Sequence, residues 1–120
     1  MLNLDTGQEL AAQAGVADNL WTRGRGLLGR RGLSEGEGLV IEHCKQVHMF
    51  FMAFPLDVIH VKRLSKEEGR VTRVVPDLRP YRLGPLVWQS DYVLELPVGT
   101  AARSGTEVGH RVRLSPLAAR

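Results

Sequence analysis

Residues 44–61 read CKQVHMFFMAFPLDVIHV, and the fold expected for the chain follows from this stretch. It holds the only cysteine, all three phenylalanines, two of the three methionines and two of the four histidines. Its last part, residues 56–61, has the two-residue period of a strand and is apolar on both faces, as in a strand that is covered on both sides. The stretch therefore predicts a central, buried β-strand.

Shorter patterns with the same period predict further strands. They are residues 39–43, 70–75, 91–96 and 110–114, with an edge strand leading into a loop within residues 1–17. The polar connection between the central strand and the next one is typical of a hairpin with a long tip. Pro76, Pro80 and Pro85 predict an irregular linker after this hairpin, because proline lacks the backbone N–H that regular pairing needs.

One helix is expected near the N-terminus. Asp18 can cap it, and its apolar positions fall on one helical face. These positions are Leu20, Gly24, Leu27 and Leu28. Together the patterns predict a mostly β fold, namely a compact β-sandwich or barrel-like sheet with one packed helix near the N-terminus. The chain, residues 1–120, is expected to form a single domain.

Charge and composition restrict the classes of protein to consider. The net charge is +3, and acidic residues are spread along the chain. No apolar run is long enough for a signal peptide or a membrane span, so we expect a cytoplasmic protein that does not contact a membrane. A single cysteine cannot form an internal disulfide, which fits a reducing compartment. Nothing in the composition implies a cofactor.

Four motifs occur in order along the chain. They are RGRGLLGR at residues 23–30, Cys44-x-x-x-His48 followed by FMAFPLDVI at residues 51–59, Pro80-Tyr81-Arg82, and VLELPVG at residues 93–99. Over about residues 20–113 they resemble the domain-of-unknown-function 192 family, whose members often have Pro-Trp-Arg at the third motif. The resemblance implies a compact, mostly β, bacterial-type small domain without a settled activity. The chain departs from the family at Ala53, where Arg or Lys is usual, at Lys62, where Asp is common, and at His60 and His110, where Phe and Asp are typical.

Cys44, His48 and Met52 are spaced by four residues, which places them on one side of a helix or a strand. A thiolate, an imidazole and a thioether would together suit Cu(I), and the first two would suit Zn(II). Alternatively, Cys44 and Met52 pack in the core and a hydrogen bond holds His48. We favour this second interpretation, because two of the three are ordinary core residues.

Asp57 opens the central strand and is expected to be partly buried. An unpaired buried charge is costly, so we expect an ion pair with Arg82 or Arg79 from the proline-rich linker. This pair would pin the linker over the strand, or it would line a pocket for a polar ligand. The neighbouring run MFFMAF, residues 49–54, does not alternate, so one of its faces is either an exposed binding patch or covered by the fold.

These observations predict a non-catalytic accessory module that binds a small polar ligand or a protein partner. The expected ligand-binding residues are His48, Phe51, Met52, Asp57 and Arg82. The alternative is a metal- or thiol-dependent enzyme in which Cys44 and His48 act as metal ligands or as nucleophile and base, although no third, orienting group is evident. The sequence does not decide whether the protein is an enzyme, and it favours the binding module.

Two further motifs carry less weight. Nucleic-acid binding through the arginines of the expected helix is disfavoured by the small net charge and by the lack of aromatic residues beside them. These arginines are Arg23, Arg25, Arg30 and Arg31. Residues 24–29 match a dinucleotide-binding fingerprint letter for letter, but no strand precedes them, so we attribute the match to chance.

Overall fold

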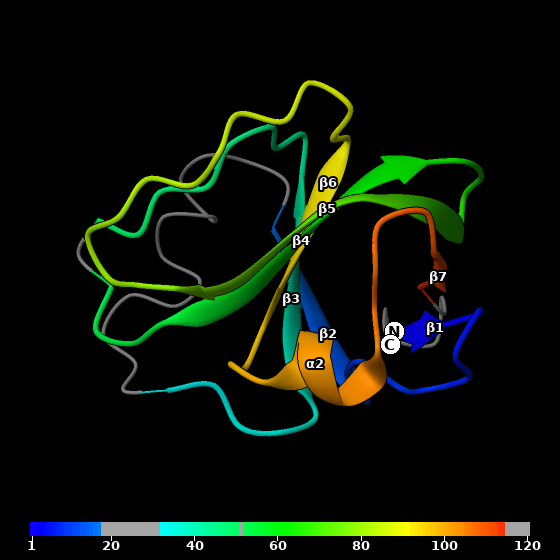
Figure 1. Ribbon diagram of the computed structural model, residues 1–120, viewed down its shortest axis with the longest axis horizontal. Helices are drawn as coiled ribbons and strands as arrows, with labels where there is room; N and C mark the ends of the chain where they lie inside the picture. Colours follow the sequence, from blue (N-terminus) through cyan, green and yellow to red (C-terminus); the bar gives the residue numbers. More distant parts are fainter. Residues whose placement is uncertain (18–31, 51, 115–120) are drawn as a thin grey trace.

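The computed structural model describes residues 1–17, 32–50 and 52–114, which form one curled β-sheet with a short helix beside it (Figure 1). The elements are β1 (Leu2–Asn3), β2 (Gln13–Ala17), β3 (Glu37–Glu42), β4 (Leu56–Arg63), β5 (Glu68–Leu78), β6 (Tyr92–Leu96), α2 (Thr100–Ser104) and β7 (Arg111–Arg113). Their order in the sheet is β1-β7-β5-β4-β6-β3-β2. All neighbours pair antiparallel except β2 and β3, which run parallel, so the sheet is an antiparallel half-barrel with one parallel edge strand.

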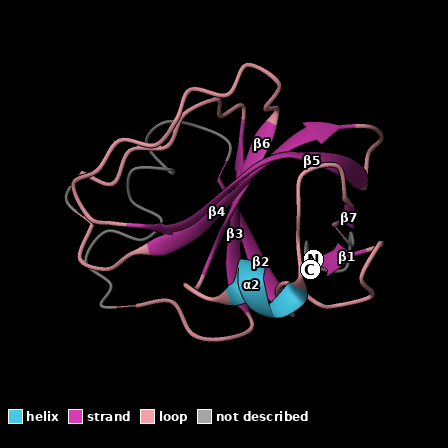
Figure 2. Ribbon diagram, viewed as in Figure 1, coloured by secondary structure: helices cyan, strands magenta, loops and turns pink. Residues whose placement is uncertain are grey.

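The predicted mostly β, barrel-like class is confirmed, and the described residues contain a short helix that the sequence did not predict. Within the described residues the only helix is α2, near the C-terminus (Figure 2). The helix expected from Asp18 falls on residues 18–31, which lie outside the described residues. Gly99 and Gly105, both with positive φ, bound α2, and so short a segment shows no helical period in the sequence. No helix in the described parts of the chain is long and apolar enough to cross a membrane.

β4 is the central strand that the sequence predicted. Residues 56–61 are all buried, and the strand has core on both faces. Ile59 and Val61 contribute to one cluster of buried side chains, whereas Leu56 and Val58 contribute to the other. Each fully buried aliphatic side chain of this kind stabilises the fold by about 1.5–3 kcal/mol, so β4 anchors both halves of the core.

The predicted hairpin of β4 and β5 is present, but the effect predicted for Pro76 was wrong. β5 runs through Pro76 to Leu78 and stays paired with β4. The pairing shifts register between Leu56/Val58 on β4, and Asp77 has a φ of 52°. Pro76 therefore lies in a β-bulge, where its missing N–H is tolerated because bulged residues do not take part in the regular hydrogen-bond ladder.

The first and last strands close one edge of the sheet. Leu2 of β1 lies opposite Arg113 of β7. The buried amide of Asn3 donates to Thr106 Oγ1 at 2.9 Å, across 103 positions of sequence. Its Oδ1 accepts the backbone N–H groups of Asp5 and Thr6. The asparagine is thus hydrogen-bonded at both ends of its amide and fastens β1 to the connection between α2 and β7.

Candidate functional site

Two connections of the chain run side by side at one end of the molecule (Figure 2). Residues 43–50 leave β3, and residues 79–88 leave β5; we call them the paired loops. Met49 N–H donates to the Arg82 carbonyl at 2.9 Å, and His48 lies opposite Leu83 in an isolated bridge. Further bonds, from Gly84 N–H to the Val47 carbonyl and from Val87 N–H to the Lys45 carbonyl, extend the ribbon. Its shape is therefore fixed by backbone pairing.

The ribbon has a buried side and an exposed side. Val47 and Met49 are buried and join the cluster beneath β4, whereas the intervening His48 and Phe50 are exposed. A Cβ on Gly84 would come within 3.2 Å of the Val47 carbonyl, so a glycine lets the two loops approach. Buried and exposed side chains therefore alternate from Val47 to Phe50, although the sequence of residues 49–54 shows no such alternation. The alternation arises because residues 47–49 pair with the partner loop as in a strand.

Large apolar side chains lie exposed along the paired loops. Eight described residues of this kind are exposed, and five of them belong to this ribbon. They are Phe50 (45% exposed), Tyr81 (62%), Leu83 (59%), Leu86 (50%) and Trp88 (72%), and we call them the docking face. The ring of His48 stacks on Phe50, with the ring centroids 5.2 Å apart. Exposed aromatic side chains are more frequent on interaction surfaces than on the rest of a protein surface.

The backbone at Tyr81 is unusual. Arg82 N–H donates to the Arg79 carbonyl at 3.2 Å, and Tyr81 has a φ of 63° after Pro80, as at the third position of a type II turn. Glycine or asparagine is normal there, because a bulky residue in this conformation costs about 1–2 kcal/mol. Tyr81 N–H also donates to the Met49 carbonyl, so Tyr81 and Arg82 together oppose Met49 in a bulge. Strain of this kind is typical of functional positions.

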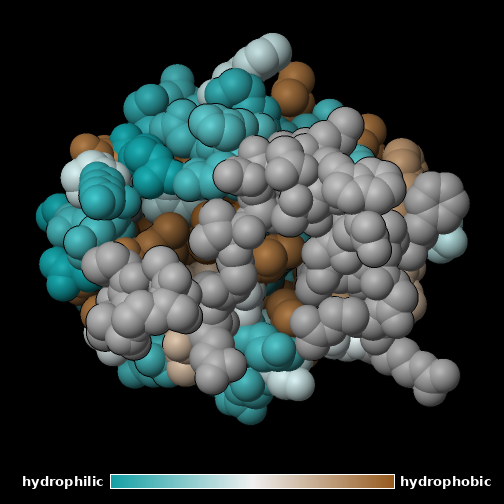
Figure 3. Space-filling model, turned by 180° about the vertical axis from the view of Figure 1, so that it is seen from behind, coloured by the Kyte–Doolittle hydropathy of each residue, from teal (hydrophilic) through white to brown (hydrophobic). Residues whose placement is uncertain are grey.

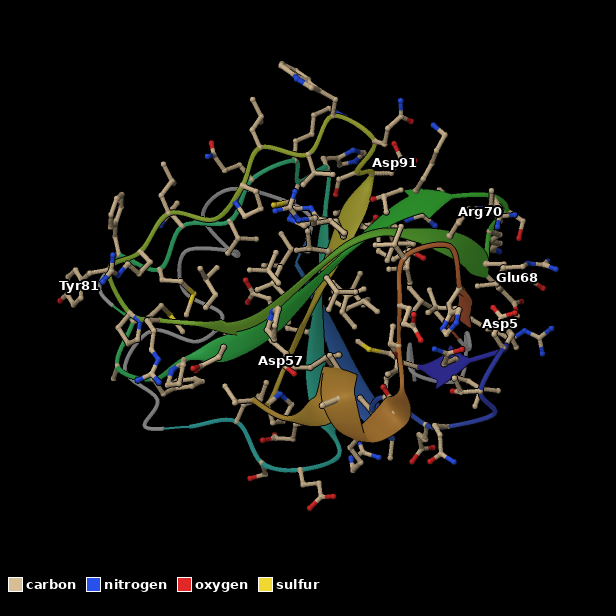
Figure 4. The ribbon with its side chains drawn as sticks, viewed as in Figure 1. Asp5, Asp57, Glu68, Arg70, Tyr81 and Asp91 are labelled. Carbon is tan, nitrogen blue, oxygen red and sulfur yellow. The ribbon has the colours of Figure 1, made fainter. Side chains whose placement is uncertain are left out.

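Asp57 is buried as predicted, but the predicted ion pair was wrong. Its carboxylate accepts three backbone N–H groups, from Asp77 at 2.9 Å, Gly99 at 3.1 Å and Ala101 at 2.9 Å. Arg79 instead pairs with Asp77 at 2.9 Å. Figure 4 shows Asp57 against the start of α2, at a distance from Tyr81 on the paired loops. Asp57 therefore fastens α2 and the bulge of β5 to β4, which is a structural role.

The five residues expected to bind a ligand occupy different environments. His48 and Arg82 are exposed and belong to the paired loops. His48 lies opposite Leu83, the residue that follows Arg82. Met52 is half-buried and packs against the cluster beneath β4. Asp57 lies apart from them beside α2, and Phe51 is outside the described residues. The structure thus brings two of the described four to one surface.

Cys44 is buried at the base of the paired loops. Its Sγ donates to the Gln46 carbonyl at 3.3 Å, while His48 lies on the exposed side of the ribbon. No three His, Cys, Asp or Glu side chains gather closely enough to hold a metal ion within residues 1–17, 32–50 and 52–114. The arginines proposed for nucleic-acid contact and residues 24–29 fall outside those ranges.

A buried serine–histidine pair also lies at this base. Ser90 Oγ donates to the Cys44 carbonyl at 2.7 Å, so His60 Nδ1, 2.8 Å from Ser90 Oγ, must be the donor of that second bond. His60 Nε2 then carries no proton, and it has no hydrogen-bond partner among the described residues. Burial, and to a smaller extent the charge of Arg73, lowers the pKa of His60 to about 4. The pair links His60 of β4 to the Cys44 carbonyl at the base of the paired loops.

The comparisons with known proteins agree with this architecture. Residues 2–114 match the family described as DUF192, Uncharacterized ACR, COG1430. The chain belongs to the DUF192 family. A similar fold is seen in a crystal structure of a protein of unknown function from Novosphingobium aromaticivorans DSM 12444. That structure has a TM-score of 0.70 and 26% identity, over 84% of this chain and 74% of that one.

A second solved structure resembles this DUF192 domain in fold. It is described as a "putative transcription regulator" from Sinorhizobium meliloti 1021, with a TM-score of 0.65 and 22% identity over 83% of this chain and 80% of that one. No curated protein matches the sequence significantly. The family and its fold are thus shown.

Sequence reasoning placed Tyr81 in an irregular linker of this DUF192 domain and did not single out Leu83, Leu86 or Trp88. The signal available was the density of large apolar residues between prolines, where a solvated linker would carry polar ones. Their exposure became apparent only through the pairing with residues 43–50, which sets which side of each loop faces the core.

Proposed function

We propose that this DUF192 domain is a non-catalytic module that binds an extended segment of another protein along the docking face. The observation that carries the proposal is that eight large apolar residues are exposed in the described part of the chain, and five of them lie on one ribbon. Isolated apolar residues on a surface need no explanation, whereas a cluster rich in Tyr, Trp and Phe is characteristic of interface centres.

The ribbon is rigid enough to present these side chains without rearrangement. Gln46 Nε2 donates to the Gly84 carbonyl at 2.9 Å, and Lys45 Nζ donates to the Trp88 carbonyl at 2.9 Å. Val47 and Met49 hold the opposite side in the core. A preformed surface loses less conformational entropy on binding, which favours recognition.

An extended segment fits the dimensions of the docking face. Tyr81 to Trp88 covers seven residue steps, which in an extended chain correspond to at most roughly 23 Å. A partner strand or an extended peptide of about seven residues has that length.

Selection from a random twelve-residue peptide library displayed on phage tests the proposal. The protein carrying Tyr81→Ala and Trp88→Ala is compared with wild type and with Val98→Ala/Val108→Ala, which removes apolar residues that are 48% and 61% exposed elsewhere. We expect peptides that bind wild type and the control but lose at least tenfold in affinity for the first variant. Failure to select any peptide, or binding that the first variant retains, would refute the proposed function.

A further inference from the structure

The paired loops carry charge of one sign. Residues 43–50 and 79–88 contain three basic residues, Lys45, Arg79 and Arg82, and no acidic residue, although the chain has 13. We propose that the segment bound at the docking face is acidic as well as apolar, with carboxylates flanking a short apolar core. This inference rests on the proposed function and specifies the chemistry of its partner.

The positive charges lie at both ends of the docking face. Lys45 Nζ is held beside Trp88, since it donates to the carbonyls of Trp88 and Ser90 at 2.9 and 3.2 Å. Arg82 follows Tyr81 on the bulge at the other end. Carbonyl oxygens position the ammonium group of Lys45 but do not neutralise it, so its charge remains available to a carboxylate.

Arg82 is the stronger anchor of the two arginines. Arg79 already pairs with Asp77, whereas Arg82 is exposed and forms no ion pair within the described residues. A guanidinium can bind a carboxylate through two parallel hydrogen bonds. With Lys45 at the Trp88 end, the geometry favours two carboxylates about six residues apart in an extended partner, on either side of Leu, Phe, Trp or Ile.

Two other partners fit the docking face less well. Single-stranded nucleic acid stacks its bases on flat rings, but Leu83 and Leu86 are aliphatic and only three cations are available for phosphates. A second copy of the chain would bring its own cations against these, because the same surface carries no acid. An acidic, apolar polypeptide satisfies both the rings and the charges.

Charge exchange tests the inference on the peptides selected above. We expect the selected sequences to contain more Asp and Glu than the library. Fluorescence anisotropy measures the affinity for the labelled peptide that binds wild type most tightly. Arg82→Glu should weaken this affinity about tenfold. Changing the acidic residues that flank the apolar core of the peptide to Lys should restore binding to the variant. Lys66→Glu is the matched control, since it makes the same change of charge at the exposed tip between β4 and β5 and should leave affinity within twofold.

The outcomes separate this inference from the proposed function. Selected peptides without acidic enrichment, or an Arg82→Glu variant that binds as wild type, would overturn the acidic partner and leave peptide docking intact. Failure to select any peptide overturns both. Binding of a labelled twenty-nucleotide oligo(dT) that is lost in Trp88→Ala and falls steeply with salt would overturn the acidic polypeptide partner in favour of nucleic acid. A dimer in sedimentation that Trp88→Ala abolishes would overturn it in favour of a second copy of the chain.

Discussion

Asp57 and His60 lie three positions apart on β4, and both are polar and buried, yet the fold satisfies them to different degrees. The carboxylate of Asp57 accepts three backbone N–H groups. The imidazole of His60 has one hydrogen bond, through Nδ1, and Nε2 has no partner among the described residues. The corner around α2 is therefore closely fastened, whereas the base of the paired loops carries a buried, unsatisfied atom that destabilises it.

The largest effect is expected at Asp57. Asp57→Ala would leave three buried backbone donors without an acceptor and should lower the free energy of unfolding by about 3–5 kcal/mol, measured by urea denaturation. Asp57→Asn keeps one oxygen acceptor and should cost less. A loss below about 1 kcal/mol for the alanine variant would show that these donors find water, and the contrast with His60 would disappear.

A pH dependence is expected from His60. In the unfolded chain the imidazole takes up a proton near its ordinary pKa of 6.5, but in the folded chain it does so only near pH 4. Its neutral form stabilises the fold fully above pH 6.5, and this contribution is lost as the pH falls from 6.5 toward 4. Thermal unfolding should show a Tm that falls by several degrees over this range.

The matched variant for this prediction is His60→Phe, which cannot take up a proton and also removes the unpartnered Nε2. Carboxylates titrate in the same range, so the informative quantity is the difference between the two proteins. We expect the variant to show a flatter Tm profile below pH 6.5. Identical profiles for both proteins would mean that His60 is hydrated in the fold.

A smaller loss is expected for Ser90→Ala. The substitution removes the hydroxyl that links His60 Nδ1 to the Cys44 carbonyl, so both of these groups lose a buried partner. The free energy of unfolding should fall by about 1–2 kcal/mol, less than for Asp57→Ala, because fewer and uncharged hydrogen bonds are lost. Faster amide hydrogen exchange at Met49 and Gly84 would show that the base holds the paired loops. Unchanged exchange there would contradict this assignment.

The smallest stability effect is expected at the docking face. Tyr81→Gly relieves the left-handed backbone conformation and should stabilise the fold by no more than about 1 kcal/mol, since glycine also makes the unfolded chain more flexible. The same variant should bind the selected peptide less tightly. A destabilisation above about 1 kcal/mol would show that the tyrosine is needed for folding rather than for binding.

The central strand was predictable because its signal is local. Six successive residues that are apolar on both faces can be stable only inside a sheet with two covered sides, and β4 has that position. The burial of Asp57 and its need for hydrogen-bond partners could be predicted from the same run. The identity of these partners could not be predicted, because nearly every residue has a backbone N–H group. Those of Gly99 and Ala101 also lie more than 40 positions further along the chain.

The candidate site was only partly predictable for a related reason. His48 and Arg82 were singled out, but the surface they share arises from pairing between two loops that are each irregular alone. Nothing local indicates which of Leu83 and Gly84 faces the core, because that depends on where Val47 lies across the ribbon. Pro80 predicted an irregular linker, but the positive φ at Tyr81 runs against the preference of that residue.

The pairing of β1 with β7 has a consequence for the order in which the protein forms during synthesis. Residues 2 and 3 are made before the rest of this domain, whereas their strand partner and Thr106, which binds Asn3, are made about a hundred residues later. At about 5–20 residues per second, the N-terminal segment waits at least five seconds for them. Until then the edge of β5 that receives β7 is open to strands from other chains. Folding of this domain should therefore become complete, and the edge of β5 protected from other chains, only after β7 has left the ribosome.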